Sequence, residues 1–330
     1  MVKILFYDTK PYDKELFENY NKNYGFEIKY LESKLNNETA PLAVGYDAVC
    51  IFVNDVADKE TLEILKQCGV KLVVLRCAGF NNVDIQNLPE GMKVVRVPRY
   101  SPYAVAEHAV ALLLSVDRKI YKSYQRTKKY NFTLNGLLGF DIHGKTVGVI
   151  GTGKIGKVFI QIMKGFGTEV LAYDVYKDEE AAKELGFKYV ELDELYEKSD
   201  IISLHCPLTK ENENMINKEA MEKMKDGVVI INTSRGKLIN SDDLIKSLST
   251  GKIGGVGLDV FDDEGDFFLN DMSNSYYRST ELSVLLSMPN VVITSHQAFF
   301  TKEALDKIGQ VSMDNIKSFF ETGECENFVE

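Results

Sequence analysis

Apolar and polar positions in the first hundred residues predict strands separated by helices. Short runs rich in Val, Ile and aromatic residues, typical of buried strands, lie at 2–7, 48–53, 72–77 and 94–97. Between them, residues 12–24 and 58–68 carry apolar side chains at helical spacing. This alternation predicts a parallel sheet with helices on its faces.

A second series of the same kind begins near residue 145. Its strand candidates are residues 146–150, 169–173, 201–204, 228–231, 255–258 and 291–294. The chain has 330 residues, which also favours two domains. We therefore expect an α/β fold of two Rossmann-like or flavodoxin-like parallel-sheet domains.

The segment between the two series predicts the domain boundary. Ser101 followed by Pro102 is typical of a helix N-terminus. Residues 104–129 contain no Gly or Pro, which predicts one long helix, apolar and buried in its first half and basic and exposed in its second. A last helical pattern at 302–321 is expected to return to the first domain. The predicted domains are 1–100 plus 299–330, and 101–298.

Charge and composition exclude several classes of function. Lys and Arg number 39 against 49 Asp and Glu, a formal net charge of −10, so neither nucleic acid nor an anionic membrane is an expected partner. We expect no signal peptide or membrane span, because the apolar runs are too short. The five cysteines lack CxxC spacing, so neither a disulfide scaffold nor a metal site is expected. An acidic cytoplasmic protein is predicted.

A glycine-rich loop joins strand 146–150 to the next helical pattern. It reads Gly151-Thr152-Gly153-Lys154-Ile155-Gly156, which is GxGxxG between a strand and a helix. In such loops the first glycine permits the tight turn, the second lets the backbone approach a pyrophosphate, and the third allows close helix packing. The helix N-terminus adds free N–H groups for the phosphates. The loop predicts a dinucleotide site.

Asp174 refines this prediction. It ends the strand at 169–173, eighteen residues after Gly156, where an acceptor for a ribose 2′-hydroxyl is expected. A carboxylate there repels the 2′-phosphate of NADP, and neither Val175 nor Tyr176 supplies a cation for it. Lys177 lies about one turn too late. NAD is therefore the expected cofactor.

Charged residues follow three later strands directly. Arg235 follows strand 228–231, an acidic cluster follows strand 255–258, and His296 follows strand 291–294. Ligands of parallel α/β sheets bind outside the carboxyl ends of strands, so these residues are expected at one edge. The cluster offers Asp262, Asp263, Glu264 and Asp266, and spacing alone does not choose among them.

The chemistry of these side chains is complementary. An arginine binds a carboxylate through two parallel hydrogen bonds, and a histidine exchanges the proton of a hydroxyl–carbonyl pair. A carboxylate on the far ring nitrogen would fix the tautomer of the histidine. Beside a nicotinamide, this set suits the interconversion of a 2-hydroxy acid and a 2-keto acid. His205 also follows a strand and competes with His296, whereas His108 and His143 are expected to be structural.

Together these motifs resemble the D-isomer-specific 2-hydroxyacid dehydrogenases, and within them the D-lactate dehydrogenase branch. The resemblance covers essentially the whole chain, including residues 79–84, 205–209, 232–236, 257–264 and 295–299. It implies a catalytic domain and an NAD domain with the active site in the cleft between them. It also implies pairing through the NAD domains, as a homodimer or a dimer of dimers.

The resemblance assigns roles that spacing did not. It makes Arg235 the carboxylate-binding residue, His296 the acid/base and Glu264 its partner. Backbone N–H groups of the loop Cys77, Ala78 and Gly79 are expected to bind the same carboxylate. In the family, certain positions line the nicotinamide and adenosine sites. The residues of this chain that match them are Cys206, Pro207, Asn212, Thr233, Ser234 and Asp259.

Three aromatic residues are expected to shape the substrate pocket. Many lactate-acting members carry tyrosine where this chain has Phe299, so one hydroxyl contact is lost, and Tyr100 is a candidate to replace it. Phe52 matches the position whose bulk limits the substrate side chain. Phe52 and Phe299 together predict a small apolar pocket suited to a methyl group, although each aromatic is also a plausible core residue.

The leading hypothesis is reduction of pyruvate to D-lactate. Another D-2-hydroxy acid, such as 2-hydroxyisocaproate or glycerate, is the nearest alternative. A formate dehydrogenase has no use for a carboxylate–histidine pair, so Glu264 argues against it. An NAD(H)-sensing, corepressor-like regulator on the same scaffold is the alternative from another class; the set Arg235, Glu264 and His296 speaks against it.

Overall fold

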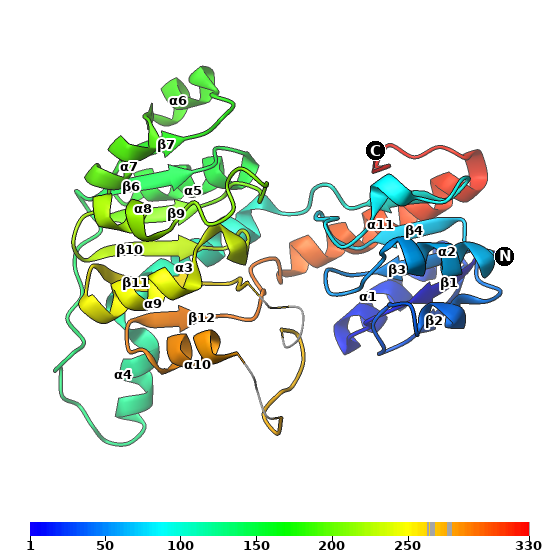
Figure 1. Ribbon diagram of the computed structural model, residues 1–330, viewed down its shortest axis with the longest axis horizontal. Coiled ribbons are helices and arrows are strands. Elements are labelled where there is room, and N and C mark those ends of the chain that lie inside the picture. The colour runs from blue at the N-terminus through cyan, green and yellow to red at the C-terminus, as the bar shows by residue number, and fades with distance from the viewer. Residues whose placement is uncertain (263, 265–267, 276–278, 330) are drawn as a thin grey trace. The chain divides into compact units, whose positions relative to one another are not determined.

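The computed structural model describes residues 1–262, 264, 268–275 and 279–329. The chain divides into two compact units (Figure 1). The first unit contains Met1–Ser101 and Phe300–Glu330, and the second is the continuous segment Pro102–Phe299. The α/β class with two parallel sheets, expected from the pattern, is confirmed.

The first unit contains a five-stranded parallel sheet in the order β2-β1-β3-β4-β5. Its strands are β1 (Lys3–Phe6), β2 (Glu27–Tyr30), β3 (Ala48–Ile51), β4 (Leu72–Leu75) and β5 (Lys93–Arg96). Every residue of β3 and β4 is buried. A strand buried on both faces has no polar alternation, which is why these two read as continuous apolar runs.

Three α-helices belong to the first unit: α1 (Pro11–Asn21), α2 (Lys59–Gln67) and α11 (Lys302–Thr322). Short 3-10 helices span Ala40–Ala43 and Ile85–Asn87. Helices α1 and α11 pack together, and α11 buries Met313 and Ile316 against Ile4 and Phe6 of β1. The hydroxyl of Tyr24 donates a hydrogen bond of 2.6 Å to Asp314. The last helix is thus part of the core of the first unit.

The second unit contains a seven-stranded parallel sheet in the order β12-β11-β10-β9-β6-β7-β8. Its strands are β6 (Thr146–Ile150), β7 (Glu169–Tyr173), β8 (Lys188–Tyr189), β9 (Ile201–Leu204), β10 (Val228–Asn232), β11 (Ile253–Leu258) and β12 (Val291–Ile293). The order of the strands changes side between β6 and β9: β7 and β8 follow on one side of β6, and β9 to β12 on the other. Such a reversal opens a crevice at the carboxyl ends of the strands.

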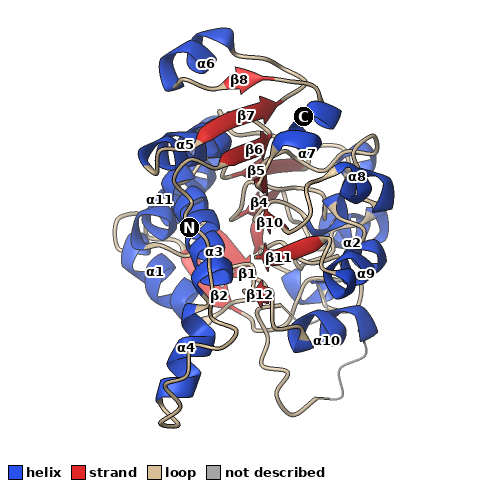
Figure 2. Cartoon of the chain, turned by 90° about the vertical axis from the view of Figure 1, so that its left-hand side faces the viewer, coloured by secondary structure: helices blue, strands red, loops and turns tan. Residues whose placement is uncertain are grey.

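Helices cover both faces of this sheet (Figure 2). One face carries α3 (Pro102–Arg118), α5 (Lys154–Gly165) and α6 (Glu179–Leu185), which share one apolar core. The other carries α7 (Leu192–Lys198), α8 (Lys218–Lys223), α9 (Ser241–Thr250) and α10 (Thr280–Ser287), which share another. A 3-10 helix spans Gly236–Leu238.

The prediction of one helix over 104–129 is wrong. The structure has two helices, α3 and α4 (Ile120–Thr127), separated by Lys119 in the left-handed conformation at φ 49°. The ammonium group of Lys119 donates to the carbonyl of Leu138 at 2.6 Å. A tertiary contact therefore accompanies the break, and no Gly or Pro marks it. As expected, the first half is largely buried and α4 has no buried residue.

All other predicted helices and strands are present, although several strands are shorter than predicted. Residues 52–53 and 76–77 lie beyond the ends of β3 and β4. Strands β2 and β8 were not predicted. All five cysteines are free thiols. No helix among the described residues is long and apolar enough to cross a membrane.

Candidate functional site

The residues predicted to carry the chemistry follow neighbouring strands of the second sheet. Strands β12, β11, β10, β9 and β6 are consecutive and parallel, so their carboxyl ends lie at one edge. The glycine loop follows β6, His205 follows β9 and Arg235 follows β10. Asp259 follows β11, and His296 follows β12.

The glycine loop is shaped by close backbone contacts. Gly151 has φ 99°, and a Cβ atom there would lie 2.5 Å from the backbone nitrogen of Cys206. A Cβ on Gly156 would lie 2.0 Å from the carbonyl oxygen of Gly151. Neither position accepts a side chain without movement of the backbone. A Cβ on Gly153, the N-cap of α5, would meet nothing within 4 Å, so this glycine borders open space.

Asp174 is tied to the glycine loop. Its carboxylate accepts hydrogen bonds from the backbone nitrogen of Thr152 at 2.6 Å, from the Thr152 hydroxyl at 3.1 Å, and from the nitrogen of Tyr176 at 2.9 Å. It remains partly exposed beside the loop. Lys177 instead pairs with Glu191 at 3.4 Å, so it does not serve as a cation beside Asp174. The carboxylate thus lies beside the loop for which the sequence predicts an acceptor of a ribose hydroxyl.

Other polar groups at this edge fit a dinucleotide. The Thr233 hydroxyl is buried, and its hydrogen-bonding capacity is not used by any of the described residues. The Ser234 hydroxyl donates to the carbonyl of Cys206, which joins the ends of β9 and β10. Asn212 uses its amide to close the loop that follows Cys206, by bonds to Pro207 and Thr209. The donor set and the open space over Gly153 together fit NAD.

Arg235 is presented by a short turn after β10. The side chain of Asn232 accepts from the nitrogen of Ser234 at 2.9 Å and donates to the carbonyl of Arg235 at 2.8 Å, which fixes the turn. The guanidinium group is partly exposed and donates to the carbonyl of Ser234 at 2.7 Å. Its other nitrogens have no hydrogen-bond partner among the described residues, so the fork is open to a carboxylate.

His296 and Glu264 form the predicted pair. The Nδ1 atom of His296 lies 2.8 Å from Oε1 of Glu264, and both side chains are about one-fifth exposed (21% and 18%). The second oxygen of Glu264 accepts from the nitrogen of Phe261 at 3.2 Å. Nε2 of His296 has no protein partner among the described residues. A histidine held on one nitrogen and open on the other suits proton exchange with a ligand.

The structure describes only part of the acidic cluster that follows β11. Asp262, half-exposed, lies 3.8 Å from the ammonium group of Lys237 and so is engaged elsewhere. The competing candidates Asp263 and Asp266 lie outside the described residues. Within the described part of the cluster, Glu264 is the carboxylate that contacts His296.

Asp259 supports the segment that carries His296. It is fully buried, and its carboxylate accepts from the nitrogens of Gln297 and Ala298 at 2.9 and 2.8 Å and from the Thr294 hydroxyl. Burial opposes ionisation, but these bonds and one from His108 hold the pKa of Asp259 below its usual value. His296 has a left-handed backbone at φ 51°, and its nitrogen donates to the Asp259 carbonyl.

The competing histidine has a different environment. Nε2 of His205 lies 2.9 Å from the Ser203 hydroxyl, and its ring packs on Phe159. Its Nδ1 atom is buried and has no partner in the described part of the chain. Burial lowers the pKa of His205 to about 3. A ring that stays neutral at physiological pH is a poor proton donor, which favours His296 as the acid/base.

The remaining predicted substrate residues, apart from Phe299, lie at the carboxyl edge of the first sheet. Phe52 follows β3, Cys77 to Gly79 follow β4, and Tyr100 follows β5. Phe52 and Cys77 are each 6% exposed, whereas Ala78, Gly79 and Tyr100 are partly exposed. Phe299, at 8% exposure, is the last residue of the second unit.

Two supporting residues escaped the sequence analysis. His108 was expected to be only structural, yet its Nε2 lies 3.0 Å from the Thr294 hydroxyl and 3.3 Å from Asp259, beside the catalytic candidate. Arg76, in a run predicted to be a buried strand, is a fully buried cation at the end of β4. A charge inside an apolar run was the available signal for Arg76.

Comparisons with known proteins agree with this geometry. The family model of the NAD binding domain of D-isomer specific 2-hydroxyacid dehydrogenases matches residues 110–298. The D-lactate dehydrogenase of Escherichia coli K12 is 49% identical over 327 residues, covering 99% of each chain. A structure described as the pyruvate reductase of Chlamydomonas reinhardtii superposes with a TM-score of 0.93 at 41% identity, covering 99% and 98% of the chains. A D-2-hydroxyisocaproate dehydrogenase structure gives 0.86 at 31% identity, covering 99% of each.

Proposed function

The chain belongs to the D-isomer specific 2-hydroxyacid dehydrogenase family, is NAD-dependent, and, we propose, reduces pyruvate reversibly to D-lactate. The observation that carries this proposal is the contact between His296 and Glu264, at the same sheet edge as Arg235. Nε2 of the histidine has no protein partner in the part of the chain that the structure describes. An acid/base and a carboxylate anchor are the two protein groups that a 2-keto acid requires.

Each side chain has one task in the proposed reaction. Bound NADH supplies the hydride that reaches the keto carbon. Arg235 holds the substrate carboxylate through its guanidinium fork. Protonated His296 gives its Nε2 proton to the keto oxygen, which becomes the hydroxyl. Glu264 holds the Nδ1 proton and stabilises the imidazolium before the transfer. In oxidation of D-lactate the neutral imidazole takes the hydroxyl proton back.

The glycine loop and the strand ends beside it offer groups for the cofactor. We propose that N–H groups at the start of α5, reached over Gly153, bind the pyrophosphate, with Lys154 and Ile155 in the first helical turn. Asp174 accepts the ribose hydroxyls. Cys206, Pro207, Asn212, Thr233, Ser234 and Asp259 border the rest of the site. Residues 101–298 serve as the NAD-binding domain, and residues 1–100 with 299–330 as the catalytic domain.

Aromatic residues set the size of the substrate in this proposal. Phe52 limits the side chain of the keto acid, Phe299 contributes apolar surface, and Tyr100 offers a hydroxyl. Backbone N–H groups of Cys77, Ala78 and Gly79 assist Arg235 at the carboxylate. This pocket favours a methyl group, which is the side chain of pyruvate.

The direct test follows NADH absorbance with pyruvate, 2-ketoisocaproate or hydroxypyruvate, and NAD reduction with D- or L-lactate. We expect pyruvate to have the highest kcat/KM, and D-lactate to react where L-lactate does not. A higher kcat/KM with 2-ketoisocaproate would assign the chain to the 2-hydroxyisocaproate dehydrogenases of the same family. Reaction with L-lactate alone would contradict the proposed stereochemistry.

Assembly and location are part of the proposal. The resemblance supports a homodimer or a dimer of dimers formed through the second unit. The composition and the short apolar runs support the cytoplasm as the location. Light scattering with size-exclusion chromatography distinguishes a dimer from a tetramer. A monomer that retains full activity would contradict the proposed assembly.

A further inference from the structure

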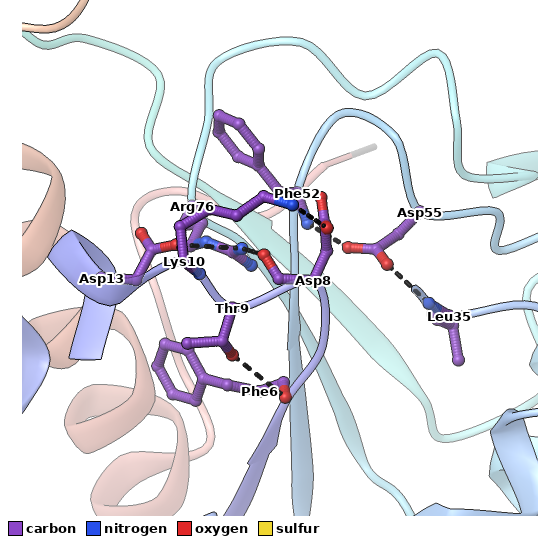
Figure 3. A network of polar contacts seen from close by, with 9 residues as sticks. All are labelled: Phe6, Asp8, Thr9, Lys10, Asp13, Leu35, Phe52, Asp55 and Arg76. Carbon is purple, nitrogen blue, oxygen red and sulfur yellow. Dashed lines mark hydrogen bonds and ion pairs between the residues drawn. The ribbon is translucent and has the colours of Figure 1, made fainter. Parts of the chain in front are cut away.

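A buried charged cluster lies at the carboxyl edge of the first sheet, where β1, β3 and β4 end (Figure 3). Arg76, 2% exposed, is at its centre. Its Nη2 atom donates to the carbonyl of Asp8 at 2.7 Å and lies 3.4 Å from a carboxylate oxygen of Asp13. Asp8 is also buried and pairs with Lys10 at 2.8 Å. The proposed chemistry assigns no task to this cluster.

The cluster reaches the substrate candidate Phe52. The guanidinium carbon of Arg76 lies over the Phe52 ring, 4.9 Å from its centroid. This is within the distance at which a cation is attracted to an aromatic face. The cluster therefore contacts one of the aromatic side chains proposed to limit substrate size.

The backbone of Phe52 is fixed separately. Its nitrogen donates to the carboxylate of Asp55 at 2.6 Å, and its carbonyl accepts from the Asn82 amide at 2.8 Å. The other oxygen of Asp55 accepts from the nitrogen of Leu35, also at 2.6 Å. Because these bonds hold only the backbone, they do not by themselves fix the side-chain torsions of Phe52. The contact with Arg76 acts on the ring itself.

Charge keeps Arg76 in place. Burial disfavours a charged guanidinium, but the neighbouring carboxylates, Asp13 foremost, outweigh it and raise the pKa of Arg76. The cation is therefore permanent, and it is too deeply buried to bind substrate itself. Its action on a ligand has to pass through a neighbour.

We propose that Arg76 is a positioning residue that, anchored by Asp13 and Asp8, holds the Phe52 ring in the orientation that excludes bulky 2-keto acids. This rests on the proposed function, in which Phe52 limits the substrate side chain. Arg76→Lys would keep the charge but lose the planar guanidinium group whose central carbon lies over the ring. The ring would then move aside, and longer substrates would enter.

The test is a double-mutant cycle on substrate selectivity, measured as the ratio of kcat/KM for 2-ketobutyrate to that for pyruvate. We expect Phe52→Leu to raise this ratio about tenfold, and Arg76→Lys to raise it about three- to tenfold. In the Phe52→Leu background, Arg76→Lys should change the ratio less than twofold, because the ring it acts on is gone. NADH affinity should stay within about twofold of native in each variant.

Two further variants keep the outcome decisive. Asp13→Asn leaves Arg76 present but removes its anchor, and we expect a shift of the same sign. If Arg76→Lys does not fold, Asp13→Asn tests the positioning role of Arg76 in its place. Lys93→Met removes a cation 5.4 Å from the Phe328 ring in the same unit, away from Phe52, and should leave selectivity unchanged.

The test distinguishes a failure of the proposed role of Phe52 from a failure of the proposed role of Arg76. If Phe52→Leu leaves the ratio unchanged, Phe52 does not limit the substrate, and the proposed pocket is overturned together with this inference. If Phe52→Leu shifts the ratio but Arg76→Lys and Asp13→Asn do not, the pocket stands and the role of Arg76 is overturned. An equal effect of Arg76→Lys in both backgrounds overturns it as well, because it reveals a general structural role.

Discussion

Replacing His205 by glutamine should make the second unit more resistant to acid. The imidazole is largely buried, no charged group among the described residues stabilises its protonated form, and burial lowers its pKa from 6.5 to about 3. Below pH 6.5 the unfolded chain therefore binds a proton that the folded chain does not. Stability is lost as the pH falls from 6.5 towards 3. Glutamine keeps a polar atom near Ser203 and does not titrate.

The size of the effect follows from the two pKa values. Each unit of pKa difference corresponds to about 1.4 kcal/mol of free energy. Between pH 7 and pH 5 the unfolded histidine becomes almost fully protonated while the folded one stays neutral. Native protein should thus lose about 2 kcal/mol from this group, a loss that His205→Gln avoids. The variant need not be more stable at pH 7; only its pH dependence is predicted.

Unfolding in urea of the cofactor-free protein at pH 7, 6 and 5 measures this difference. The transition that NADH shifts to higher urea identifies the second unit. His143→Gln is the matched control, because it removes an exposed histidine from the same unit. Parallel pH curves for native protein and His205→Gln would refute the reasoning. His205 would then be able to carry a proton in the folded state and would compete again with His296.

Three further predictions concern the site. Asp174→Ala should weaken NADH binding and reduce discrimination against NADPH, because it removes a hydroxyl acceptor and a phosphate-repelling charge together; equal use of both cofactors by the native protein would contradict this. Arg235→Lys should lower kcat/KM for pyruvate by the equivalent of about 2–5 kcal/mol while thermal stability and NADH affinity stay near native. Near-native kinetics would remove Arg235 from the site. Glu264→Gln should lower kcat for pyruvate reduction while NADH affinity stays near native, because His296 loses its carboxylate partner; steady-state kinetics and an NADH titration measure this. A parallel loss of NADH affinity would mean that Glu264 only shapes the loop.

The local sequence predicted those elements in which all residues have the same degree of burial. Strands β3 and β4 are buried on both faces, so their residues form unbroken apolar runs. Strand β2 was missed because it is a four-residue edge strand whose residues alternate between exposed and partly buried. The break at Lys119 was missed because it accompanies a contact with Leu138, far along the chain.

The candidate site was predictable to the extent that it depends on strand ends. Arg235 and His296 were found because each directly follows a recognisable strand. The support of His296 by Asp259 was not foreseen, because it depends on hydrogen bonds to backbone nitrogens 38 and 39 residues away. Arg76 was overlooked because the predicted strand 72–77 extended over it, whereas β4 ends at Leu75.

The first unit is built from two stretches of chain that are separated by the whole of the second unit. During synthesis on the ribosome, the sheet of the first unit emerges early, but Met313 and Ile316, which cover part of it, emerge only after the whole second unit. The second unit is continuous and has all of its core residues before then. A nascent chain therefore carries an uncovered apolar sheet face throughout the translation of some two hundred residues. Because of this order of synthesis, the first unit depends on protection from aggregation. The second unit can fold as soon as its own residues have been synthesised.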